Sequence, residues 1–183
     1  MSVFTNSSAT HSVEQARAYT AAVLGLLGAR DPLDVLRGTP DAARQLVAGL
    51  AEHELSLPEA DGKWSLLRVI RHLADSELVW AYRMRTVLAQ DRSPITGYDQ
   101  DVWANQLHYD RASLTESLEE FAVVRRSNLR LVAAATDAEL SRVGVHAERG
   151  EESVRHMLRL YAGHDLLHLR QLERIRRVVA GSG

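Results

Sequence analysis

The segment YAGHDLLHLRQLER, which runs from Tyr161 to Arg174, has apolar residues three and four positions apart. This spacing places them on one face of an α-helix, and the same period dominates the rest of the chain. No segment shows the regular alternation of polar and apolar residues that a convincing strand would have. Long helices with connections of moderate length indicate a bundle. The sequence therefore predicts an all-α fold, a four-helix bundle with an additional N-terminal helical segment.

Capping residues, prolines and glycines indicate where the helices begin and end. A first apolar face, from about Val13 to Leu27, ends before the sequence GARDP. Thr39 is the predicted N-cap of the next helix, because Pro40 follows at the favoured first helical position. We therefore expect residues 1–38 to form a helical extension that packs on the bundle, and residues 39–180 to form the bundle domain. Three further core helices are expected. The first covers about residues 63–89, and the second begins after the cap Asp110 and ends near residue 135. The last helix of the chain has Glu151 and Glu152 in its first turn.

The composition is that of a globular protein without a strong charge bias. The 183 residues include 22 basic and 24 acidic side chains, so no basic excess points to a nucleic acid or an anionic membrane as partner. Cysteine is absent, which excludes disulfides and leaves nitrogen or oxygen atoms to hold any metal. No run approaches the roughly 20 apolar residues of a membrane span, and the N-terminus does not resemble a secretory signal. We expect a cytoplasmic protein.

Three polar residues of the last predicted helix lie on or beside its apolar stripe. On a helical wheel His168 falls inside the stripe, and His164 and Asp165 lie near its edges. An unpaired polar group in a core costs about 1 to 3 kcal/mol, so each of these side chains needs a partner. Histidines at positions i and i+4 are close enough to bind one ion, but two core histidines bonded to neighbouring helices would give the same pattern. A third ligand from another helix would favour the metal site.

His72 is the best candidate for that third ligand. It lies in the middle of a predicted helix, whereas His156 is about 12 Å from His164 along the helix axis and His146 is in a predicted loop. The same helix carries Glu77 near the centre of its apolar stripe, where a carboxylate is costly unless it is paired. Glu77 is therefore either the partner of an arginine on another helix, or a group beside the metal that supports a ligand or carries a proton.

Four aromatic residues have two interpretations each, and two acidic residues have one. The aromatic ones either line the mouth of a pocket or belong to the core, and the acidic ones suit loop and capping positions. They are Trp64, Tyr98, Trp103, Tyr161, Asp99 and Asp101.

Three segments together resemble the DinB-like (YfiT-like) superfamily, whose members are regarded as metalloenzymes. The segments are GKWSLLRVIRHLADSE at 62–77, GYDQDVW at 97–103 and YAGHDLLHLRQLERI at 161–175. The resemblance extends over about residues 39–177. It implies a four-helix bundle that commonly dimerises, with a divalent ion bound by three histidines, here His72, His164 and His168. Relatives of this kind include transferases of low-molecular-weight thiols such as bacillithiol.

These features predict a metal-dependent enzyme, either a thiol S-transferase of the bacillithiol type or a related transferase or hydrolase, acting on a small electrophilic substrate. His72, His164 and His168 would bind a divalent ion such as Zn, Ni or Fe, and Glu77 and Asp165 are the candidate catalytic acids or bases. The expected partners are a small-molecule substrate, a low-molecular-weight thiol and a second copy of the chain. The alternative is a non-catalytic dimeric bundle with a structural or sensory metal site. A fourth protein ligand would favour that alternative, and an adjoining pocket would favour the enzyme.

Overall fold

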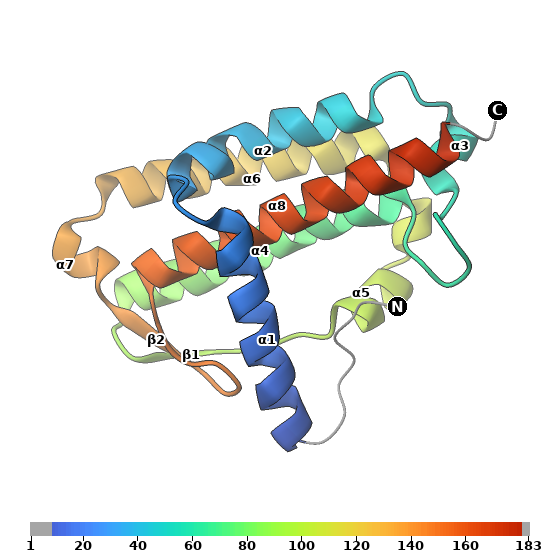
Figure 1. Ribbon diagram of the computed structural model, residues 1–183. Coiled ribbons are helices and arrows are strands. Elements are labelled where there is room, and N and C mark those ends of the chain that lie inside the picture. Colours follow the sequence, from blue (N-terminus) through green and yellow to red (C-terminus); the bar gives the residue numbers. More distant parts are fainter. Residues whose placement is uncertain (1–8, 181–183) are drawn as a thin grey trace.

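Four helices pack around a common core, as the sequence predicts (Figure 1). The computed structural model describes residues 9–180, so the first eight residues of the predicted extension and the last three of the chain lie outside it. Each bundle helix packs against two others, in the order α2, α8, α4, α6 around the bundle. Within the described residues, no helix has the length and apolar character needed to cross a lipid bilayer. The helices are α2 (Pro32–Val47), α4 (Leu66–Ala89), α6 (Leu114–Ala134) and α8 (Val154–Val179).

The bundle core consists of two clusters of buried apolar side chains. One contains Leu73, Phe121 and Leu172, and the other contains Trp80 and Met157. Along α4, α6 and α8, buried polar residues stand between the apolar residues of the two clusters. The candidate site is built around this polar layer.

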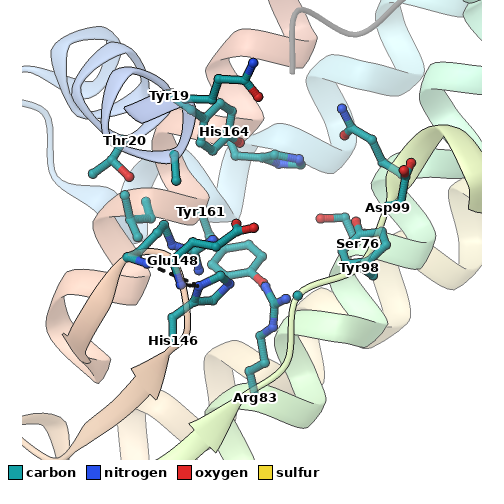
Figure 2. A pocket seen from close by; sticks show the side chains of 16 residues that line it. Tyr19, Thr20, Ser76, Arg83, Tyr98, Asp99, His146, Glu148, Tyr161 and His164 are labelled. Carbon is teal, nitrogen blue, oxygen red and sulfur yellow. Dashed lines mark hydrogen bonds between the residues drawn. The ribbon is translucent and has the colours of Figure 1, made fainter. Parts of the chain in front are cut away.

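Helix α1 (Ala9–Leu27) crosses the bundle and packs against α8 (Figure 1). The two helices approach closely at Gly163 of α8, where the backbone of Val23 lies directly against the glycine. Only a residue without a Cβ atom fits there. Helix α1 also contributes Tyr19 and Thr20 to the wall of a pocket (Figure 2).

Helix α2 begins seven residues before the predicted N-cap Thr39, so that prediction is wrong. Asp31 is the N-cap, and its carboxylate accepts hydrogen bonds from the backbone N–H groups of Leu33 and Asp34. Thr39 lies inside the helix and donates its hydroxyl proton to the carbonyl of Val35, at 2.8 Å. The helix therefore runs continuously across residues 38 and 39, and the division of the chain at that point stays a prediction.

Pro40 is tolerated inside α2 because another side chain satisfies the carbonyl that it leaves open. Proline has no N–H, so the carbonyl of Leu36, four residues earlier, lacks its usual helical donor. The guanidinium of Arg125 donates to that carbonyl from Nη1, at 2.7 Å. The α2 helix thus depends on a side chain of α6.

Three short strands form a small sheet, although the sequence predicted none. Strand β1 (Ser93–Ile95) pairs in parallel with β2 (Val143–His146), which pairs antiparallel with β3 (Gly150–Ser153). Segments of three or four residues are too short to show a clear two-residue period. The sequence placed Glu151 and Glu152 in the first turn of the last helix, and this prediction is wrong. Both residues belong to β3, and the helix begins at Val154.

The remaining elements are short helices in the connections. The predicted cap Asp110 lies instead in a short 3-10 helix, and Ser113 caps α6 by accepting a hydrogen bond from the backbone N–H of Glu116. These elements are α3 (Glu52–Ser56), α5 (Gln100–Gln106), η1 (Tyr109–Arg111) and α7 (Asp137–Leu140).

Replacing Gly163 by alanine is expected to destabilise the protein by at least about 2 kcal/mol, because the added methyl group would overlap the backbone of Val23 and push α1 away from α8. The matched control is Gly25→Ala in α1, where a Cβ meets nothing within 4 Å. This second substitution should leave the stability unchanged or raise it by up to about 1 kcal/mol. Chemical unfolding of the two variants measures the difference, and equal stabilities would contradict the close approach.

Candidate metal centre

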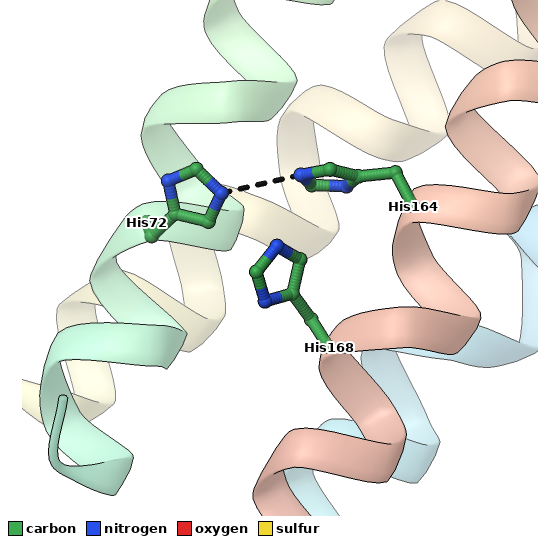
Figure 3. A group of neighbouring side chains, drawn as sticks. All are labelled: His72, His164 and His168. Atoms are coloured by element: carbon green, nitrogen blue, oxygen red, sulfur yellow. Dashed lines mark hydrogen bonds between the residues drawn. The ribbon is translucent and has the colours of Figure 1, made fainter. Parts of the chain in front are cut away.

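Three histidines from two helices converge at the centre of the bundle (Figure 3). His72 comes from α4, and His164 and His168 occupy successive turns of α8. One ring nitrogen from each lies within 4.8 Å of the others, and Nε2 of His72 is 3.2 Å from Nε2 of His164. The structure therefore brings together the three residues that the sequence selected as metal ligands.

The chemistry of the cluster, and the spacing of one pair of its nitrogens, fit a divalent ion. Two imidazole nitrogens bound tetrahedrally at about 2.0 to 2.1 Å from one ion lie about 3.3 to 3.4 Å apart, close to the observed 3.2 Å separation. Burial, aided by the neighbouring imidazoles, lowers the pKa of His72 well below its usual range. Burial also lowers the pKa of His168 to about 3. Both rings are therefore neutral near pH 7, which is the protonation state that a metal requires.

Neighbouring side chains fix the orientation of two of the rings. Nδ1 of His168 lies 2.8 Å from Oε1 of Gln171, so this nitrogen carries the proton and Nε2 keeps its lone pair. The ring of His72 packs edge-on against Trp64, with centroids 5.2 Å apart. Trp64 is thus a core residue and not part of a pocket mouth.

The two predicted catalytic carboxylates, Glu77 and Asp165, both bind a buried arginine of α6. Arg125 donates from Nη2 to Oε2 of Glu77 at 2.7 Å, and from Nη1 to Oδ2 of Asp165 at 2.7 Å. All three side chains are at most 2% exposed. Glu77 therefore has the partner that the sequence offered as one of its two interpretations, an arginine on another helix. Of the two carboxylates, Asp165 comes near the histidines, with Oδ1 3.7 Å from Nδ1 of His164.

One guanidinium serves two buried carboxylates, and their pKa values shift in opposite directions. Burial raises the pKa of Glu77 in spite of the nearby charge of Arg125. Burial acts in the same direction on Asp165, but Arg125 and His164 outweigh it, so the pKa of Asp165 is lowered. The amide of Asn128 donates to the remaining oxygen of Glu77, at 2.6 Å. All four carboxylate oxygens are consequently hydrogen bonded.

The helical wheel also contained a signal for Arg125 that the sequence analysis missed. In α6, Arg125 and Asn128 fall on the same stripe as Leu118, Phe121 and Val132, all of which are buried. A charged residue at that position signals a buried ion pair, in the same way that Glu77 did on its own helix.

A cavity of about 450 Å³ opens beside His164 (Figure 2). Its wall combines α4, α8, helix α1, the loop before α5 and the turn between β2 and β3. Tyr98 and Tyr161 line the cavity, which agrees with the first of the two interpretations of the aromatic residues. Trp103 instead packs against Tyr98, with ring centroids 4.5 Å apart. The cavity is also lined by Ser76, Arg83, Asp99, His146, Glu148 and Arg149.

Of the two acidic residues, Asp99 has the capping role that the sequence suggested, and Asp101 lies inside a helix. The side chain of Asp99 accepts hydrogen bonds from the backbone N–H groups of Asp101 and Val102 at the start of α5. Asp99 also lines the cavity, while Asp101 belongs to the first turn of α5.

The fold and the cluster define a class of protein, the four-helix bundles in which histidines from two helices gather in an arrangement suited to one metal ion. Within that class, the chain belongs to the DinB superfamily, whose sequence model matches residues 36–172.

Similar proteins carry names that refer to a metal. "Putative metal-dependent hydrolase YfiT" of Bacillus subtilis is 25% identical over 146 residues, which cover 79% of this chain and 82% of the relative. A "Putative metal-dependent hydrolase" of Geobacillus thermodenitrificans is 36% identical over 69 residues, covering 38% of this chain and 39% of the relative. The solved structure of YfiT matches with a TM-score of 0.72, over 78% of this chain and 84% of that one, at 25% identity. It is described as "a probable metal-dependent hydrolase with an unusual four-helix bundle topology".

Proposed function

We propose that this protein is a metal-dependent enzyme that acts on a small electrophilic molecule in the cavity beside His164. In this proposal His72, His164 and His168 hold a divalent ion, which would supply Lewis-acid activation of a water or a thiol as the nucleophile. The observation that carries the proposal is that His164 belongs both to the histidine cluster and to the cavity wall. A ligand in the cavity would therefore lie next to one member of the cluster.

The number of ligands supports an enzyme over a structural metal site. The cluster that the described residues form has three members, whereas a structural zinc site has four protein ligands. The cavity next to it is polar as well as aromatic, which suits a small polar substrate.

The proposal gives Glu77 and Asp165 a positioning role. Their four oxygens already accept hydrogen bonds from Arg125 and Asn128, and neither residue lines the cavity. Asp165 acts on its neighbour His164 through its charge, since its Oδ1 lies 3.7 Å from Nδ1 of that ring. Glu77 acts on Arg125, and neither carboxylate exchanges protons with the substrate.

Two finer proposals concern the nucleophile and the assembly. The names of the relatives favour hydrolysis, in which water attacks the electrophile. The family resemblance also favours transfer of a low-molecular-weight thiol, in which the sulfur bonds to the electrophilic carbon and displaces a leaving group. The expected homodimer stays a prediction.

Protein purified without a histidine tag is expected to contain about one divalent ion per chain, measured by elemental analysis. Dialysis against a chelator should lower its activity at least about 100-fold, and added Zn, Ni or Fe should restore it. Activity is measured with two kinds of substrate. An activated ester is offered with water as the only nucleophile, and a reactive aryl halide is offered with bacillithiol, glutathione or cysteine. Product that needs the thiol supports S-transfer, and product from water alone supports hydrolysis. Turnover that is unaffected by metal removal would contradict the proposal.

A further inference from the structure

Arg83 of α4 brings a buried positive charge to the cavity wall without an acidic partner. Its side chain is 8% exposed, and among the described residues no carboxylate lies within ion-pair distance of it. Its Nη1 donates to the hydroxyl of Tyr161 at 3.3 Å, and its Nη2 donates to the carbonyl of Thr96. Nε is buried and has no partner. A guanidinium has five N–H donors, so most of this one's hydrogen-bonding capacity is left over.

Leaving a buried charge without a counter-charge is costly, which makes Arg83 a position that calls for an explanation. Its guanidinium lies 5.9 Å from the ring centroid of Tyr98. That contact and the bonds to Tyr161 and Thr96 hold the group in place, but none of them carries a negative charge. Figure 2 shows Arg83 reaching toward His146 and Tyr161 inside the pocket.

His146 of β2 offers a second hydrogen-bond donor beside Arg83. Its Nδ1 accepts from the backbone N–H of Glu148 at 3.1 Å, and it lies 3.4 Å from the backbone nitrogen of Arg149. Nδ1 is therefore unprotonated, so in the neutral ring the proton is on Nε2. Burial, together with the charge of Arg149, lowers the pKa of His146 to about 4, which keeps the ring neutral near pH 7. Nε2 has no hydrogen-bond partner among residues 9–180, so its N–H is free to bind a ligand.

The other charges of the cavity limit the kind of anion that fits. Arg149 is paired with Glu152, whose Oε2 lies 3.0 Å from its Nη2. Asp99 and Glu148 also line the cavity and would repel a doubly charged group more strongly than a singly charged one. One unpaired guanidinium therefore matches a single negative charge.

We propose that Arg83 and His146 bind a carboxylate group of the small molecule that occupies this cavity. A guanidinium matches the planar carboxylate with two parallel donors, and the imidazole N–H adds a third. Calling this molecule the substrate rests on the proposed function, because its reacting end would then lie toward His164. The resulting substrate class is a small carboxylic acid with an electrophilic centre.

The test is a titration of the metal-free protein with butyrate, a small molecule with one carboxylate, monitored by nuclear magnetic resonance of the histidine rings. The His146 signals, assigned with the variant His146→Gln, are expected to shift and saturate at millimolar butyrate. Arg83→Gln should weaken this binding at least about 10-fold, because it removes the charged donor. Arg83→Lys keeps the positive charge but loses the two parallel N–H donors, so its affinity should be intermediate. The matched control is Arg159→Gln, which removes an exposed arginine of α8 and should change nothing.

Four outcomes decide the matter. Saturable shifts in wild type that Arg83→Gln weakens at least about 10-fold support the carboxylate site. Butyrate affinity that is equal in wild type and Arg83→Gln would overturn it, as would an absence of binding in wild type. Tighter binding of inorganic phosphate than of butyrate would overturn the choice of carboxylate. The variant His164→Ala separates this proposal from the proposed function, because it should lose the metal and keep butyrate binding.

Discussion

Replacing Arg125 by alanine is expected to lower the free energy of unfolding by about 3 to 5 kcal/mol. The substitution would leave two buried carboxylates, Glu77 and Asp165, without their shared positive charge. It would also free the carbonyl of Leu36, which Pro40 leaves without a helical donor. Such a loss is a large part of the roughly 5 to 15 kcal/mol that stabilises a typical domain.

The control for this prediction is Arg126→Ala, at the next position of the same helix. Arg126 is exposed, so the control removes the same charge without touching the core, and its effect should stay within about 0.5 kcal/mol. Denaturant unfolding of the metal-free proteins gives both values without interference from metal binding. A loss of less than about 1 kcal/mol in Arg125→Ala would show that the polar layer contributes little to stability.

The sequence predicted the bundle and the histidine cluster because both depend on regular spacing. His164 and His168 share a face through their four-residue separation, and His72 was the histidine in the middle of another core helix. The pairing of helices α4 and α8 then brings the third ring to the first two. Burial and spacing were sufficient to predict the three histidines, because all three lie on regular helices.

The errors of prediction lie where a distant residue overrides a local signal. Thr39 and Pro40 have the sequence pattern of a helix start, yet Arg125, far along the chain, supplies the donor that lets α2 continue through the proline. Glu151 and Glu152 suit the first turn of a helix by charge, but pairing with β2 makes them a strand. Tertiary contacts of this kind leave no local pattern.

The sequence could not predict the cavity, because its wall comes from five separate parts of the chain. Helix α1 lies before residue 36, where the match to the DinB superfamily begins, yet it contributes Tyr19 to the cavity. His146 appeared to be a loop residue, and its place in β2 points its ring toward Arg83 (Figure 2). The three histidines thus lie within the matched region, while part of the wall that would contact a substrate lies outside it.

Alanine at His72, His164 or His168 is expected to reduce bound metal from about one ion per chain to a small fraction, with the helical fold retained. Each substitution removes one of three nitrogens that converge on one point, and two imidazoles alone hold an ion weakly. Elemental analysis after dialysis against a defined free-metal buffer measures the occupancy, and circular dichroism checks the fold. Activity should fall in parallel with occupancy.

A graded series makes the assignment specific. Gln171→Ala removes the acceptor that orients His168 and should weaken metal binding by about 10- to 100-fold, less than the loss of a ligand. His156→Ala should have no effect, since this histidine lies two turns from His164 on the same helix, about 12 Å along the axis. Retention of stoichiometric metal by the double variant His164→Ala, His168→Ala would refute the site. Equal losses in His156→Ala and His164→Ala would show that the metal binds elsewhere, because the two side chains are too far apart to share one ion.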